Sequence, residues 1–135
     1  MIRSFVGLLV CMSLLSFLNS CSNNSGKIRQ ISVAELRAEM ERDSNLALID
    51  VRTATEYAAA RVPYIKARID FQHITDQIDS LKLAKDQPIY LICRSGRRSL
   101  IAAKELLDMG YLQPVNVRGG TLAWTDAGYP VIKQQ

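Results

Sequence analysis

The sequence predicts an α/β fold in which helices cover both faces of a parallel β-sheet. Short apolar runs alternate along the chain with stretches whose apolar residues have helical spacing, a pattern typical of repeated β-α-β units. The runs at residues 46–49 and 88–92 are nearly free of polar residues, as strands buried on both faces are. With 135 residues, 48% of them hydrophobic, the chain has the length of one domain and can bury a core.

The first twenty residues are predicted to be a signal peptide. Arg3 precedes an uncharged stretch at residues 5–18, which is shorter than the about 20 residues of a membrane-spanning helix. The sequence that follows, Leu18-Asn19-Ser20-Cys21, resembles a bacterial lipobox. That resemblance implies that Cys21 is lipidated and begins the mature protein, so acyl chains would anchor it to a membrane. An ordinary secretory signal cleaved nearby is the alternative.

Small polar residues follow Cys21 and are expected to form a flexible tether. We assign residues 21–30 to this lipidated N-terminus and tether, and residues 31–133 to the folded domain. The expected location is therefore outside the cytoplasm, at the periplasmic face of a bacterial membrane. By resemblance to other lipoproteins, Ser22 in place of an aspartate favours the outer membrane.

The domain is expected to begin with a short strand that ends at Ile31. Ser32 and Glu35 have the spacing of a capping box, which predicts a helix that runs to about Arg42. Asp50 then stands at the carboxyl end of the strand at residues 46–49. The remaining elements are expected in this order: a short helix at residues 54–60, a strand at 67–69, an amphipathic helix at 71–83, a strand at 88–92, a helix at 100–109 closed by Gly110, a strand at 115–117, and a final helix capped by Thr121.

Residues 93–99, Cys-Arg-Ser-Gly-Arg-Arg-Ser, connect an apolar strand to an amphipathic helix. This order places the Cys93 thiol at the carboxyl end of a strand, where open α/β sheets bind their ligands. Backbone N–H groups of such a loop can surround an anion, and the helix start adds partial positive charge. Together with Arg94, Arg97 and Arg98, they are expected to lower the thiol pKa. We therefore predict a thiolate that exchanges an atom with a small anionic substrate.

The motif Cys-Arg-Ser-Gly-x-Arg-Ser resembles the active-site loop of single-domain rhodaneses, the thiosulfate sulfurtransferase family. The resemblance extends upstream to Asp50-Val51-Arg52 and Glu56-Tyr57, and downstream to Arg118-Gly119-Gly120 and Trp124, so it covers roughly residues 31–131. It implies a rhodanese-like fold and an enzyme that moves a sulfane sulfur through a persulfide on Cys93.

By the same resemblance, the loop residues bind the donor and two upstream residues support the site. Arg94, Ser95, Gly96, Arg97, Arg98 and Ser99 would hold a small anionic donor such as thiosulfate or a persulfide. Asp50 and Arg52 would brace the active-site region through hydrogen bonds and ion pairing. A thiol or a cyanide-like nucleophile would accept the sulfur, and no cofactor or metal is implied.

The stretch from Ala60 to Ala67 departs from the family pattern. Rhodaneses typically have Gly-His-Ile-x-Gly-Ala here, whereas this chain has Ala60-Arg61 and then Tyr64-Ile65-Lys66. We expect the departure to reshape one wall of the pocket. His73, the sole histidine, is expected at the surface rather than paired with Cys93.

Two other functions remain open from the sequence. Phosphatases and arsenate reductases of the cysteine-loop type need Cys-x5-Arg, whereas Cys93 and Arg98 form the shorter Cys-x4-Arg, a smaller ring that suits a sulfur atom. A non-catalytic module that binds sulfur or docks a redox partner is the other alternative. A purely structural interpretation is also open. In it, Cys93 is a small hydrophobic residue of the core, and the arginines of the loop form a solvated surface.

Composition argues against some partners. The formal net charge is +4, and outside the cysteine loop the basic residues are scattered with no interleaved aromatic stripe, so nucleic-acid binding is not expected. Of the three cysteines, Cys11 would leave with the signal peptide and Cys21 would carry lipid, which leaves Cys93 as the free thiol. The sequence indicates no oligomeric state.

Overall fold

The computed structural model of the protein describes residues 28–134. The predicted signal peptide, the lipidation site at Cys21 and most of the predicted tether lie outside the described residues. Within residues 28–134, no helix is both long and apolar enough to span a membrane. The first strand begins at Arg29, two residues inside the predicted tether, because Arg29 and Gln30 pair in register with Val115 and Asn116.

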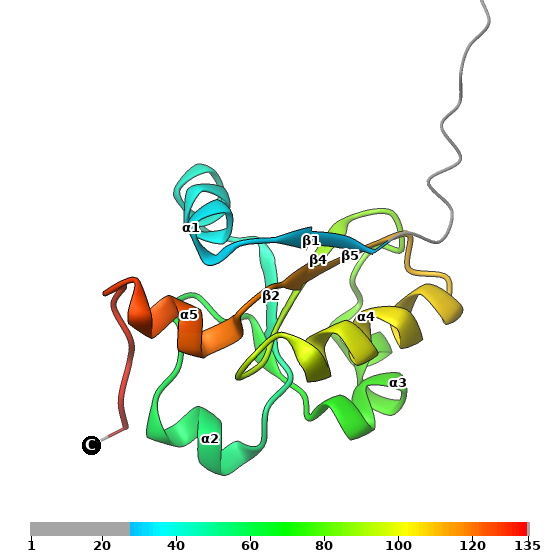
Figure 1. The fold of residues 1–135 in the computed structure, drawn as a ribbon. Coiled ribbons are helices and arrows are strands. Elements are labelled where there is room, and N and C mark those ends of the chain that lie inside the picture. Colours follow the sequence, from blue (N-terminus) through cyan, green and yellow to red (C-terminus); the bar gives the residue numbers. More distant parts are fainter. Residues whose placement is uncertain (1–27, 135) are drawn as a thin grey trace, which may run out of the picture.

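A five-stranded sheet forms the centre of the domain (Figure 1), and its strand order is β1-β5-β4-β2-β3. Every pairing in it is parallel, as the sequence predicts. The strands are β1 (Arg29–Ile31), β2 (Ala47–Asp50), β3 (Ala67–Arg68), β4 (Pro88–Ile92) and β5 (Gln113–Val117). The α-helices are α1 (Val33–Arg42), α2 (Ala54–Ala59), α3 (Ile74–Gln77), α4 (Arg97–Asp108) and α5 (Gly120–Asp126), and the 3-10 helices are η1 (Phe71–His73) and η2 (Ile78–Leu81).

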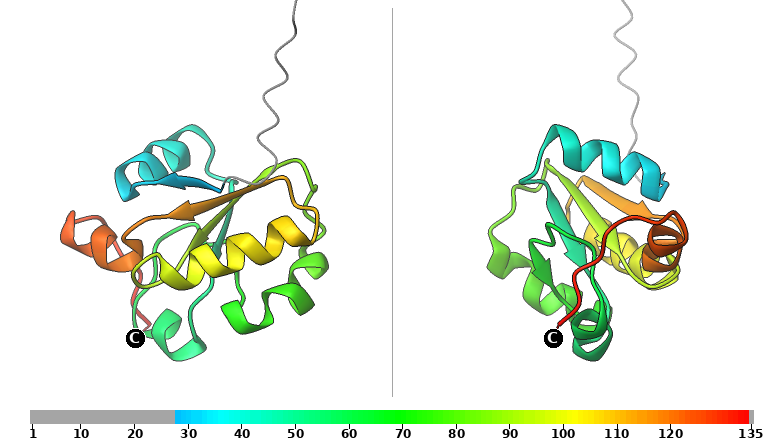
Figure 2. Two further views of the ribbon diagram at one scale, coloured as in Figure 1. Left: turned by 45° about the vertical axis from the view of Figure 1, so that its right-hand side comes forward. Right: turned by 90° about the vertical axis from the view of Figure 1, so that its left-hand side faces the viewer.

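Helices cover both faces of the sheet, which confirms the predicted fold class (Figures 1 and 2). On one face α3, η2 and α4 bury Ile74, Ile78 and Leu106, respectively, against the sheet. On the other face α1 and α5 bury Leu36 and Trp124. Side chains of β4 alternate between these two cores, as a strand buried on both faces requires. The helix α2 contributes no buried residue and lies beyond the carboxyl ends of the strands.

The prediction of one continuous helix at residues 71–83 is wrong, although the apolar residues that suggested it are buried as expected. Ile74 and Ile78 are fully buried, but the segment divides into η1, α3 and η2. The Ser80 hydroxyl donates to the Gln77 carbonyl at 2.6 Å, a local bond that competes with helical hydrogen bonding. Lys82 adopts the left-handed conformation, with φ of 51°, and ends the segment.

Helix starts differ from the sequence expectation at two glycines. Helix α4 begins at Arg97, after Gly96 with φ of 93°, rather than at residue 100. Helix α5 begins at Gly120 after Gly119, so Thr121 lies inside the helix and is not its cap. Other predicted helix ends are confirmed: Ser32 and Glu35 form the capping box of α1, and Gly110, with φ of 85°, closes α4.

Candidate active site

Cys93 directly follows β4, at the end of the sheet where the strands present their carboxyl termini. Its side chain belongs to the core between the sheet and α4, and the residue is 0% exposed. It is the free cysteine of the described residues. The chain turns after Cys93 and enters α4 at Arg97, so the sulfur lies beneath the first turn of a helix.

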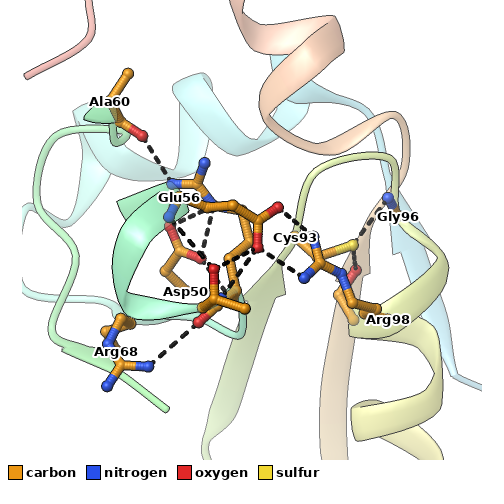
Figure 3. Close-up of polar contacts among 10 residues, drawn as sticks. Asp50, Glu56, Ala60, Arg68, Cys93, Gly96 and Arg98 are labelled. Carbon is orange, nitrogen blue, oxygen red and sulfur yellow. Dashed lines mark hydrogen bonds and ion pairs between the residues drawn. The ribbon is translucent and has the colours of Figure 1, made fainter. Parts of the chain in front are cut away.

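The Cys93 sulfur receives hydrogen bonds from the loop that follows it (Figure 3). The Gly96 N–H donates to Sγ at 3.1 Å, and the Ser99 Oγ lies 3.3 Å from it. Burial alone would raise the pKa of the Cys93 thiol, but the Ser99 hydroxyl and the backbone N–H groups of Ser99, Gly96 and Ser95 outweigh it and lower the pKa. The direction agrees with the expectation from the sequence, but the favourable causes are these hydrogen bonds, and Arg94, Arg97 and Arg98 are not among the main ones.

The turn at Gly119 and Gly120 holds the backbone of the cysteine loop from the α5 side. The Thr121 N–H donates to the Cys93 carbonyl at 2.9 Å, and the Leu122 N–H donates to the Arg94 carbonyl at 3.1 Å. A β-carbon on Gly120 would come within 2.6 Å of two backbone atoms of Arg94 and still closer to the Cys93 carbonyl oxygen. Glycine is required here for close backbone approach, as the sequence predicts.

An ion pair from α2 reaches the loop from its other side (Figure 3). Both terminal nitrogens of Arg98 donate to the Glu56 carboxylate, at 2.9 and 2.6 Å. Arg98 holds the pKa of Glu56 at about 2, with further help from Thr53. Sequence reasoning used Glu56 for the family resemblance but missed it as a site residue, because 42 residues separate the partners. Because Glu56 lies three residues after Thr53, the sequence indicates a capping box at this position. It does not indicate that the Glu56 carboxylate also binds Arg98.

Asp50 and Arg52, the two residues predicted to brace the site, form a buried ion pair just before α2. The Asp50 carboxylate is 0% exposed and accepts from the Arg52 side chain, with a shortest distance of 2.6 Å. The same Arg52 nitrogen donates to the Ala60 carbonyl at 2.8 Å, and Arg68 donates to the Arg52 carbonyl at 3.3 Å (Figure 3). The pair thus holds both ends of the segment that carries Glu56.

A cavity of about 350 Å³ opens beside the loop. The departure from the family pattern does form one of its walls, through Ala60, Arg61 and Val62. The atypical Tyr64 is 63% exposed and has φ of 61°, a conformation that favours glycine. The full lining is Arg52, Glu56, Ala59, Ala60, Arg61, Val62, Arg94, Thr121, Leu122, Thr125, Asp126 and Val131.

The remaining predicted site residues are placed as follows. Arg94, Ser95 and Arg97 are exposed on the loop, and no carboxylate of residues 28–134 lies within ion-pairing distance of either arginine. His73 is exposed in η1, as predicted. Within the described part of the chain, no three side chains are grouped so that they could hold a metal ion.

The fold and the loop together define a parallel α/β domain with a hydrogen-bonded cysteine at a strand-to-helix turn, and comparison with known proteins gives the family. The rhodanese-like domain family matches residues 32–127, so the chain belongs to that family.

Three similar proteins illustrate the relationship. A Bacillus subtilis (strain 168) protein named "Putative sulfurtransferase YtwF" is 39% identical over 98 residues, which are 73% of this chain and 91% of that protein. Thiosulfate sulfurtransferase 18 of Arabidopsis thaliana is 34% identical over 124 residues, 83% of this chain and 90% of that protein. The crystal structure of a rhodanese-related protein from Thermoplasma volcanium is 28% identical, with a TM-score of 0.66 over 77% of this chain and 97% of that one. These relatives support sulfur transfer as the general activity.

Proposed function

We propose that the protein is a rhodanese-type sulfurtransferase in which Cys93 carries the sulfur as a persulfide. The observation that supports this best is the arrangement around the sulfur: the N–H of Gly96 at 3.1 Å and the hydroxyl of Ser99 at 3.3 Å, in a site where the thiol pKa is lowered. These donors stabilise an anionic sulfur without a separate general base.

The proposed reaction has two half-reactions. The Cys93 thiolate attacks the outer sulfur of thiosulfate, so that a new S–S bond forms while the old one breaks and its electron pair leaves with sulfite. A nucleophilic acceptor then attacks the outer sulfur of the persulfide, and the Cys93 thiolate leaves. A thiol acceptor becomes a persulfide and cyanide becomes thiocyanate. A persulfide donor would enter the first step in the same way.

Access to the sulfur is a condition of this chemistry. Cys93 is 0% exposed, so a donor can touch Sγ only after the atoms that cover it move aside. The exposed guanidinium groups of Arg94 and Arg97 would draw an anion to the loop. Arg98 contributes less to this attraction, because the Glu56 carboxylate neutralises it at 2.6 Å.

The same ion pair bears on the phosphatase alternative. A cysteine-loop phosphatase uses an arginine that is free to bind the oxygens of its substrate, whereas both terminal nitrogens of Arg98 donate to Glu56. This observation and the short Cys-x4-Arg spacing favour sulfur transfer. A non-catalytic sulfur-binding or redox-docking module has the same site, and turnover separates it from an enzyme.

Steady-state formation of thiocyanate from thiosulfate and cyanide tests the proposed function. We expect the wild-type protein to turn over with ping-pong kinetics, and Cys93→Ser to lose the activity while it keeps the circular dichroism spectrum of the wild type. Near wild-type turnover by Cys93→Ser would contradict the role of Cys93. A wild-type protein that takes up one sulfur but does not turn over would favour the non-catalytic module.

We also propose that the domain is exported and anchored by lipid on Cys21, at the periplasmic face of the outer membrane. The support is the lipobox-like sequence that ends at Cys21, after an apolar stretch too short to span a membrane. Replacement by Cys21→Ala is expected to stop incorporation of labelled palmitate and to release the protein from membranes. Labelling of the variant, or a soluble wild-type protein, would refute the anchor.

A further inference from the structure

A line of polar side chains leads from the Cys93 sulfur into the sheet. The Ser99 Oγ lies 3.3 Å from Sγ and 2.6 Å from the Asn116 Oδ1, and the Asn116 Nδ2 donates to the Gln30 Oε1 at 3.3 Å. Gln30 and Asn116 are register partners in β1 and β5. Ser99 is 0% exposed and Asn116 1%, whereas Gln30 is exposed. The line therefore connects the buried sulfur with the surface through three neutral side chains.

The cost of burial makes these side chains unusual in the core. Ser99 and Asn116 are two of the four buried polar or charged residues of the described chain, and the other two, Asp50 and Arg52, form an ion pair. A buried amide or hydroxyl lowers stability unless its hydrogen bonds are made. The arrangement of Ser99 and Asn116 therefore matters in each state of the cysteine.

The Ser99 hydroxyl has a single proton and faces two acceptors. It can donate either to the Cys93 sulfur or to the Asn116 Oδ1, but not fully to both. Both acceptors are within reach, at 3.3 Å for the sulfur and 2.6 Å for the Asn116 oxygen. When the proton lies on the shorter contact, it points away from sulfur. In that arrangement the Ser99 oxygen is an acceptor, which suits a protonated Cys93 thiol and leaves a thiolate without this donor.

Rotation of the Asn116 amide by 180° reverses the direction in which hydrogen bonds are donated along this line of side chains. Its Nδ2 then donates to the Ser99 Oγ, its Oδ1 turns to Gln30, and the Ser99 proton becomes free to donate to the sulfur. The oxygen and nitrogen of an amide have nearly the same size, so the reversal needs no repacking. The exposed amide of Gln30 can rotate to match.

We propose that Asn116 is a positioning residue for Cys93: the orientation of its amide decides whether the Ser99 hydroxyl donates to the sulfur or turns away from it. The same side chains can thereby donate a hydrogen bond to an anionic sulfur and turn that donor away from a neutral one. For the catalytic cycle this inference rests on the proposed function, because the cysteine alternates between thiolate and persulfide only in sulfur transfer.

Charged groups around the sulfur remain constant while the amide rotates. Arg98 of α4 interacts electrostatically with Cys93, and its own pKa is raised, first by Glu56. Glu56 of α2, with a pKa of about 2, stays ionised wherever the thiol titrates. The other charged groups at this end of the sheet include Arg94 and Arg97 of the loop, the Asp50–Arg52 pair with Arg68, Arg61 and Asp126 of the cavity lining, Asp70 before η1, and Arg118 after β5. From the β5 and β1 side, Asn116 and Gln30 are neutral.

Variants that fix the direction of the line test the proposal. Asn116→Asp supplies an acceptor that cannot donate, so it should hold the Ser99 proton away from sulfur. Gln30→Glu does the same from the exposed end, because it keeps the Asn116 Nδ2 turned outward, and it leaves the core intact. We expect the Cys93 pKa to rise by about one unit in Asn116→Asp, a tenfold loss of thiolate at any pH below both pKa values, and by a smaller amount in Gln30→Glu.

The readout is the pH dependence of Cys93 alkylation by iodoacetamide in the full chain, followed on the peptide that contains Cys93. Each variant is also made with Ser99→Ala, as in a double-mutant cycle. We expect Ser99→Ala to remove most of both shifts, since the hydroxyl transmits them. Shifts of equal size with and without Ser99 would show an effect of negative charge alone, and no shift in either variant would show a purely structural Asn116; each result overturns the proposal. Failure of thiocyanate formation would overturn the proposed function and leave these pKa comparisons valid.

Discussion

On its α5 side the cysteine loop is held by backbone atoms, whereas on its α2 side it is held by charged side chains. On the α5 side, two N–H groups after Gly120 bind the carbonyls of Cys93 and Arg94. On the α2 side, Glu56 binds Arg98, and the buried Asp50–Arg52 pair anchors the segment that carries Glu56.

This difference shows which contacts can adapt to a change. The backbone carbonyls of Cys93 and Arg94 lie beside Gly120. They cannot move without displacing the cysteine loop, and a displaced loop also moves the Cys93 sulfur. The Glu56–Arg98 pair is partly exposed, so water can replace part of this interaction at little cost. We therefore expect the effects of substitution to decrease from Gly120, through the buried pair, to Glu56.

The largest loss is expected for Gly120→Ala. The added methyl would overlap backbone atoms of Cys93 and Arg94, at a position with φ of 56°, and we expect a loss of about 5 kcal/mol in the free energy of unfolding, measured by urea denaturation. Gly128→Ala is the matched control, since φ is 73° there but nothing lies within 4 Å of the added carbon; it should cost about 1 kcal/mol. Equal losses would mean that backbone conformation, and not close approach, explains the glycine.

An intermediate loss is expected when the buried ion pair is broken. Arg52→Met leaves the Asp50 carboxylate buried without its partner and removes the bond to the Ala60 carbonyl, which should cost about 4 kcal/mol of stability. The double variant Asp50→Asn with Arg52→Met removes the unpaired charge and should recover much of that loss. If the double variant unfolds as easily as Arg52→Met, lost packing explains the effect and the charge does not.

The smallest loss is expected for Glu56→Gln. The Glu56 and Arg98 side chains are 30% and 25% exposed, so solvent screens part of the interaction that lowers the Glu56 pKa, and the cost should be about 1–2 kcal/mol. Thermal unfolding of Glu56→Gln and Arg98→Met should give similar small decreases in Tm. A loss of stability as large as that of Arg52→Met would contradict the expected difference between the buried Asp50–Arg52 pair and the partly exposed Glu56–Arg98 pair.

The pH dependence of stability sharpens the same comparison. Because the folded state lowers the Glu56 pKa from 4.5 to about 2, the ionised carboxylate stabilises the fold, and this contribution is complete above pH 4.5 and lost as the pH falls toward 2. The stability difference between wild type and Glu56→Gln should therefore be constant at neutral pH and shrink in that acidic window. A difference that changes between pH 6 and 8 would contradict the assignment.

The features of the site that sequence reasoning predicted are local ones. Cys93 follows an apolar run, Gly119 and Gly120 follow another, and parallel strands bring both to one rim of the sheet. Asp50 and Arg52 are two residues apart, so their pairing also follows from local order. The same logic gave the fold class, because apolar runs buried on both faces require helices on both sides.

What the sequence did not reveal depends on distant or cooperative contacts. Glu56 meets Arg98 across 42 residues, and Ser99 meets Asn116 across 17; neither pairing has a periodic signature. The predicted helix at residues 71–83 divides into η1, α3 and η2, and apolar spacing does not report such a division. The predicted starts of α4 and α5 are wrong because glycines in the left-handed conformation occupy the N-cap positions of both helices.

Mass measurement of the intact protein after reaction with thiosulfate tests the central role of Cys93 most directly. We expect one sulfur atom to be added to the wild-type protein, to be located on the peptide that contains Cys93, and to disappear on addition of cyanide. Cys93→Ser should take up none. Sulfur on another residue, or wild-type protein that remains unmodified by both thiosulfate and a persulfide donor while folded, would contradict the account.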